Sequence, residues 1–110
     1  MATSEEFSGY ILDLLESVGE VECKRMFSGV LLKVAGRQLG IIIDDILYFK
    51  VVDFKLQNKY KDAGSSQFSY VRKDKTQPVV IKNWWSVPDF ALDNPQELVI
   101  LAEEVLAQTH

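Results

Sequence analysis

The chain has 110 residues, of which 47% are hydrophobic and 25% are charged, and its formal net charge is −4. This length accommodates one hydrophobic core, and the composition excludes an intrinsically disordered chain. No apolar run approaches the ~20 residues that a membrane-spanning helix needs, so we expect no membrane association. The one cysteine, Cys23, excludes an internal disulfide. Together with an acidic start that lacks signal-peptide features, it predicts a cytoplasmic protein.

The charges are distributed unevenly along the chain. All twelve Lys and Arg residues lie between positions 23 and 82, together with five acidic residues. The two flanking segments, residues 1–22 and 83–110, contain eleven acidic residues and no Lys or Arg. This distribution either keeps acidic helix faces in water or orients the domain toward a charged partner, and solvated faces are the more usual explanation.

The first predicted element is a helix over residues 5–17. Its apolar residues recur at spacings of three and four, which places one stripe along a helix. Thr3-x-x-Glu6 fits a capping box, and Gly19 suits the end of the helix because glycine adopts left-handed conformations without a steric cost. Residues 20–28 alternate loosely between apolar and polar, which predicts an entry segment or a short strand.

Three apolar runs follow and predict an antiparallel meander, because they are rich in β-branched and aromatic residues and end at turn residues. They are Val30–Val34, Leu39–Ile43 and Ile46–Val52, and they are separated by Ala35-Gly36-Arg37 and Asp44-Asp45. The middle run is apolar on both faces apart from Gly40, which is typical of a central strand covered on both sides. Since helices cover one face of a two-layer domain, we expect a dimer partner to supply the second cover.

The remaining elements are a helix, a hairpin and a final helix. Asp53 is a suitable N-cap for a helix over residues 54–63, and residues 68–73 and 77–85 alternate as two strands of a hairpin. A short helical turn is expected over residues 88–92. Asn94-Pro95-x-Glu97 combines an N-cap, a proline at the first helical position and a capping glutamate, so it starts the last helix. Strands joined by short turns, with helices at the ends, predict an α+β fold in a single domain over residues 1–110.

The sequence contains no recognisable catalytic or metal-binding set. One cysteine and a terminal His110 cannot make a zinc site, and Asp44-Asp45 is explained by a turn between strands. There is no G-x-S-x-G, no P-loop and no G-x-G-x-x-G. We therefore expect a protein that is not an enzyme and that uses no cofactor.

Aromatic and basic residues recur at alternating positions of the predicted strands, where they can share one face of the sheet. Such a face either stacks single-stranded nucleic acid or forms a protein interface, and Tyr, Trp and Arg are enriched at interfaces. Because neighbouring strand residues point to opposite faces, one of Trp84 and Trp85 is expected in the core. The candidate interaction surface consists of Tyr48, Lys50, Tyr70, Arg72, Lys82 and Trp84.

Short motifs stand in a fixed order along the chain. Arg25-Met26-Phe27-Ser28-Gly29 is followed by Ala35-Gly36 and then by Asp44-Asp45-x-Leu47-Tyr48-Phe49-Lys50-Val51. Residues 68–75, Trp84-Trp85-Ser86-Val87-Pro88 and residues 92–98 come next. The series covers essentially the whole chain and resembles the N-terminal domain of the TfoX/Sxy family, whose patterns in the same order are R-M-F-G-G, D-G, D-D-x-L-Y-L-K-V, F-x-Y-x-x-K-G-K, Y-Y-x-V-P and L-D-D-P-E-E-L. The departures are Ser28, where the family has glycine, Val30-Leu31-Leu32, which lacks a later glycine of the family, and the tryptophan pair, where the family has tyrosines.

The resemblance implies a two-layer α-β(3)-α-β(2)-α fold with an antiparallel sheet, like that of secretion-chaperone-like proteins. Full-length family members regulate bacterial natural competence as transcriptional coactivators with the cyclic-AMP receptor protein, and they carry a second, C-terminal domain before which this chain ends. The expected function is therefore that of a non-enzymatic regulatory or protein-interaction domain with a protein partner and the capacity to form a homodimer. The alternative is a single-stranded nucleic-acid binder that uses the aromatic and basic sheet face.

Overall fold

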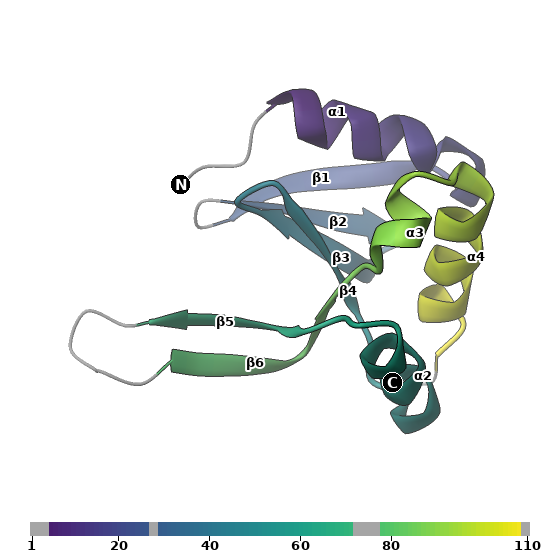
Figure 1. The fold of residues 1–110 in the computed structure, drawn as a ribbon. Coiled ribbons are helices and arrows are strands. Elements are labelled where there is room, and N and C mark those ends of the chain that lie inside the picture. Colours follow the sequence, from purple (N-terminus) through teal and green to yellow (C-terminus); the bar gives the residue numbers. More distant parts are fainter. Residues whose placement is uncertain (1–4, 27–28, 72–77, 109–110) are drawn as a thin grey trace.

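The structure of the chain is a computed structural model that describes residues 5–26, 29–71 and 78–108. A helix and a short 3₁₀ turn come first, and four strands follow them (Figure 1). These elements are α1 (Glu5–Leu14), η1 (Glu16–Val18), β1 (Val21–Met26), β2 (Gly29–Val34), β3 (Arg37–Ile43) and β4 (Ile46–Lys50). The second half contains α2 (Phe54–Asp62), β5 (Gln67–Val71), β6 (Pro78–Ser86), α3 (Asp89–Leu92) and α4 (Pro95–Leu106).

The strands of the described residues form one antiparallel sheet in the order β1-β2-β3-β4-β6-β5. The expected α+β class is therefore confirmed, but the element order differs from α-β(3)-α-β(2)-α. Residues 21–26 are a complete strand, paired with β2 from Val21↔Val34 to Met26↔Gly29, and α3 precedes α4. The segment alternates only loosely because β1 is an edge strand whose residues Glu22 and Lys24 remain in water.

Two tight turns fix the register of the β2–β3–β4 meander. The turn residues Ala35 and Gly36 have φ values of 52° and 79°, and Asp44 and Asp45 have φ values of 53° and 59°. Positive φ at both central residues is the geometry of the two-residue hairpin whose twist matches that of the flanking strands. Asp44-Asp45 is thus a turn between strands, as the sequence indicates.

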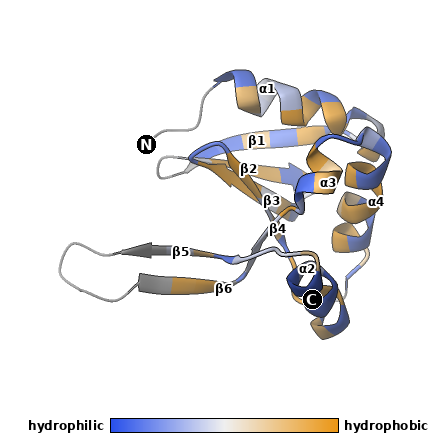
Figure 2. Cartoon of the chain, viewed as in Figure 1, coloured by the Kyte–Doolittle hydropathy of each residue, from blue (hydrophilic) through white to orange (hydrophobic). Residues whose placement is uncertain are grey.

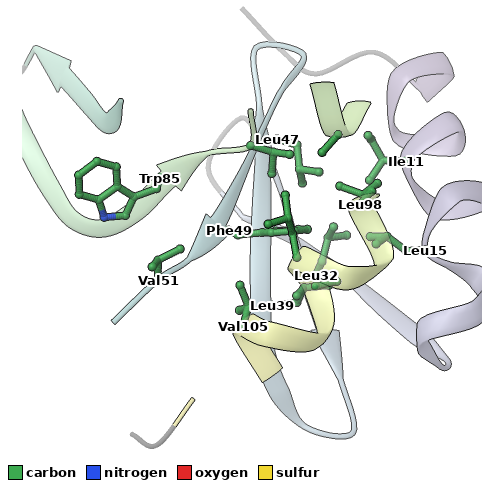
Figure 3. Close-up of a cluster of buried hydrophobic side chains, with 14 of the residues drawn as sticks. Ile11, Leu15, Leu32, Leu39, Leu47, Phe49, Val51, Trp85, Leu98 and Val105 are labelled. Atoms are coloured by element: carbon green, nitrogen blue, oxygen red, sulfur yellow. The ribbon is translucent and has the colours of Figure 1, made fainter. Parts of the chain in front are cut away.

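Helices α1, α3 and α4 lie over one face of the sheet (Figure 1). The core forms where α1 and α4 meet the central strands, and Figure 3 shows Ile11, Leu15 and Leu98 directed at strand residues such as Leu32 and Phe49. All five of these side chains are fully buried. The register shift between β2 and β3 follows Leu32 and lets Leu39 also reach this core. The apolar stripes recognised in the sequence therefore do face one another.

The other face of the central strands is buried by the chain itself. Leu31 and Ile41 lie opposite each other on β2 and β3, and each is 4% exposed in the isolated chain. On the same face Tyr48 of β4 meets Phe68 of β5 edge-on, with ring centroids 5.2 Å apart. The expectation that β3 is covered on both sides is therefore correct, but burying these side chains does not require a dimer partner.

The end of α4 is attached to the start of α2 by one buried glutamine. The Gln108 side chain is 7% exposed, and its Oε1 accepts hydrogen bonds from the backbone N–H groups of Val52 at 2.7 Å and Asp53 at 2.8 Å. Its Nε2 donates to the carbonyl oxygens of Lys50 and Val105, both at 2.9 Å. Asp53 in turn caps α2 by accepting from the N–H of Leu56.

Candidate interaction surface

The pairing of β4 with β6 brings three of the six predicted surface residues together. Lys50 lies directly opposite Trp84, and Tyr48 lies opposite Ser86, so Tyr48, Lys50 and Trp84 share one face of the sheet. All three are half-buried. Tyr70 lies on β5 and Lys82 on β6, and for these two the structure describes the backbone alone. Arg72 lies outside the described residues.

The two tryptophans divide between the faces of β6. Trp85 lies opposite Phe49 and is 8% exposed. It belongs to the core cluster, to which β6 contributes it (Figure 3). Trp84 takes the opposite face beside Lys50. The expectation that one tryptophan is core and the other lies on the second face is confirmed. A contact surface on this face would therefore use Trp84.

Both Tyr48 and Lys50 already have partners within the chain. The Tyr48 ring packs against Phe68, and burial, followed by the nearby Asp44 carboxylate, raises the pKa of its hydroxyl. The Lys50 ammonium donates to Oε1 of Gln38 at 2.9 Å. These contacts hold the two side chains in fixed positions on rigid strands. They also leave the Tyr48 ring less open to base stacking and the Lys50 ammonium less free to pair with a phosphate.

Metal-ligating and nucleophilic side chains of the described residues lie apart from one another or in unfavourable surroundings. Among them, no three His, Cys, Asp or Glu side chains gather closely enough to hold a metal ion. Cys23 is exposed on β1, and partial burial raises the pKa of its thiol, which lowers the thiolate fraction that a nucleophile needs. Within the same residues no helix combines the length and apolar content that crossing a bilayer requires.

A second surface, which the sequence analysis did not identify, is an apolar groove of about 360 Å³ between α1 and α4. Sequence reasoning treated the apolar residues of the first helix as one stripe and gave no role to Val99 or Ile100 of the last helix. Ile100 could have indicated this surface, because it is an apolar residue off the main apolar stripe of α4. It is 48% exposed in the structure. The lining residues are Leu14, Ser17, Pro95, Gln96, Val99 and Ile100.

A third surface is a hollow of about 520 Å³ between α2 and the end of α4. Helix α2 is hydrophilic over most of its length (Figure 2), and its Lys59 forms an ion pair with Glu104 of α4 at 3.0 Å in this hollow. These two charges therefore neutralise each other within the hollow.

The sequence of the chain matches a model of the TfoX N-terminal domain over residues 13–109. The chain belongs to the TfoX N-terminal domain family. The match begins inside α1 and includes all the described strands and α4, so the TfoX N-terminal domain contains both the sheet face and most of the helical groove. No curated protein matches the chain. The family is associated with the regulation of competence.

Proposed function

We propose that this TfoX N-terminal domain is a non-enzymatic, cytoplasmic regulatory domain that acts by binding another protein, in the manner expected of competence regulators. The observation that supports this most directly is the placement of Trp84 and Lys50 side by side on paired strands. A half-buried tryptophan held by a sheet provides a large contact area at a small entropic cost, and such residues often dominate the energy of protein interfaces.

The same geometry favours a protein over single-stranded nucleic acid. Base stacking needs open aromatic faces and cations free to approach phosphates. Here Phe68 packs against Tyr48, and Gln38 accepts a hydrogen bond from Lys50. The net charge of −4 also opposes the approach of a polyanion.

The test is site-specific photocrosslinking in the native cell. A photoreactive phenylalanine analogue replaces Trp84, and the matched control carries it at Asn58, an exposed residue of α2. We expect one predominant protein adduct from position 84 and none from position 58. Lys50→Glu should abolish the adduct, because it reverses the charge beside the crosslinker. Mass spectrometry then identifies the partner, and a transcriptional regulator would support the regulatory role.

The alternatives give different results in the same assay. Crosslinking to nucleic acid, together with tight binding of labelled oligonucleotides at low salt, would replace the proposal with single-stranded nucleic-acid binding. Equal adducts from positions 84 and 58 would refute a specific surface. An adduct with a second copy of the chain would support the homodimer that we also propose. Sedimentation that shows a monomer at high micromolar concentration would refute the homodimer.

A further inference from the structure

The groove between α1 and α4 is an exposed apolar feature of the helical layer. Ile100, 48% exposed, forms part of one wall, and Leu14 of α1 contributes to the other. Tyr10 stands one helical turn before Leu14 and is 46% exposed, and its hydroxyl donates to the carbonyl oxygen of Leu92 at 2.7 Å. The hydrogen bond links Tyr10 of α1 to Leu92, the last residue of α3. The groove is therefore shaped by side chains of two packed helices.

By helical spacing, one acidic residue on each helix stands next to residues that line the groove. Asp13 precedes Leu14 on α1, and Glu103 stands one turn after Ile100 on α4, and both are exposed. In the described part of the chain neither carboxylate has a salt-bridge partner, whereas Glu104 pairs with Lys59. The segments that carry the two helices contain no Lys or Arg. The rim of the groove is therefore negatively charged.

Arg37, in the first position of β3, is a basic side chain that reaches α4 from the sheet. It donates a hydrogen bond to the carbonyl oxygen of Leu106, at the last turn of α4. It thus lies one turn beyond Glu103 and at the opposite end of α4 from Pro95 and Gln96, which line the groove.

These charges decide what can occupy the groove. A second copy docked through the same face would oppose acidic rims to each other, and nucleic acid or an anionic membrane would be repelled in the same way. An apolar groove between helices suits an amphipathic helix, which inserts one apolar face. The groove-lining residues of α4 fall within Pro95–Ile100, which is about 9 Å of helix, so the groove can hold roughly two turns of a partner helix.

We propose that the α1–α4 groove binds a cationic amphipathic α-helix of a partner protein, with its apolar face on Leu14, Val99 and Ile100 and its basic residues beside Asp13 and Glu103. This inference rests on the proposed function in one respect, namely that the domain acts by binding protein. It concerns a different surface, however, so the crosslinking at position 84 and the experiment below can fail independently.

The probe is a fluorescein-labelled leucine–lysine peptide of about 14 residues, with all leucines on one helical face, whose binding to the full chain is followed by anisotropy. We expect saturable binding that weakens about tenfold in Ile100→Asn, because a polar group then meets the apolar face. The double variant Asp13→Asn, Glu103→Gln should weaken binding roughly threefold, and more at low salt than at high salt. Circular dichroism establishes that each variant is folded.

Matched controls come from two positions outside the groove. Val80 of β6 has the same 48% exposure as Ile100, and Asp62 of α2 is an exposed acid outside the groove. Val80→Asn and Asp62→Asn should leave the affinity unchanged within about twofold. A peptide of the same composition with leucines scattered around the helix should bind at least about fivefold more weakly.

The proposal is overturned if no saturable binding occurs up to millimolar peptide, or if the scattered peptide or a leucine–glutamate peptide binds as well. It is equally overturned if the groove variants behave like the controls. Self-association that Ile100→Asn abolishes would show instead that a second copy occupies the groove.

Discussion

The buried glutamine at the end of α4 gives the sharpest test of how the helical layer is attached to the sheet. Replacing Gln108 by alanine removes four hydrogen bonds at 2.7–2.9 Å, two to backbone N–H groups and two to backbone carbonyls. Its Oε1 is the acceptor for the N–H groups of both Val52 and Asp53, which connect β4 to α2. In Gln108→Ala these two partly buried donors lose that acceptor.

We expect Gln108→Ala to lower the free energy of unfolding by about 2–4 kcal/mol. A net hydrogen bond contributes about 0.5–1.5 kcal/mol, and a buried donor left unsatisfied costs about 1–3 kcal/mol. The estimate lies below the sum of these values because the site is at the edge of the core, where water reaches some of the exposed groups.

Urea unfolding followed by circular dichroism measures the change, with Gln96→Ala as the matched control. Gln96 is exposed on the same helix, so its replacement should change the free energy of unfolding by less than about 0.5 kcal/mol. Hydrogen exchange provides a local measurement, because the amides of Val52 and Asp53 should exchange faster in Gln108→Ala. A loss of less than about 1 kcal/mol with unchanged exchange at both amides would refute the reasoning.

Three further substitutions test other parts of the fold. Gly40→Ala would drive a Cβ into the carbonyl oxygen of Tyr48, so we expect urea unfolding to show a loss of stability above about 3 kcal/mol, or no folded protein. The control Gly9→Ala places its Cβ in open space on α1 and should be neutral or stabilising by up to about 1 kcal/mol. Equal effects of the two substitutions would contradict this packing. Ala35→Asn should raise the free energy of unfolding by about 0.5–1 kcal/mol in the same assay, since asparagine tolerates the φ of 52° better than alanine, and a decrease would argue against this turn geometry. Burial raises the pKa of Tyr60 above its ordinary value of 10.0, so the unfolded chain loses this proton first and stability falls as the pH rises above about 10. Tyr60→Phe removes a buried hydroxyl that lacks a hydrogen-bond partner in the described structure. Urea unfolding of this variant should give an unchanged or slightly higher stability at neutral pH and a smaller loss of stability at alkaline pH. A loss above about 1 kcal/mol at neutral pH would show that the hydroxyl is paired.

Local signals in the sequence predicted the elements that depend on neighbouring residues. Asp53 caps α2, Asn94 and Pro95 start α4, and Asp44-Asp45 closes the β3–β4 turn, as their chemistry indicates. Helix α1 ends at Leu14 and gives way to a 3₁₀ turn, a shorter helix than the predicted residues 5–17. The stripe alone does not specify that boundary, since the apolar spacing continues past it.

The candidate surface depended more on long-range pairing. Alternation placed Tyr48, Lys50 and Trp84 on sheet faces, but the β4–β6 register decided that they share one. The chain-internal partners Phe68 and Gln38 were not visible in the sequence, because each comes from a strand other than β4.

The sequence by itself determined the caps and turns, because these follow from residues within a few positions of one another. It also determined the family and the α+β class, because these follow from the order of such local signals along the chain. Only the tertiary structure decided that the second face of β3 is buried within the chain, that Gln108 connects α4 to α2, and that α1 and α4 leave an acidic-rimmed groove. Each of these results from contacts between segments far apart in the chain, whose side chains have no local spacing that reveals their partners.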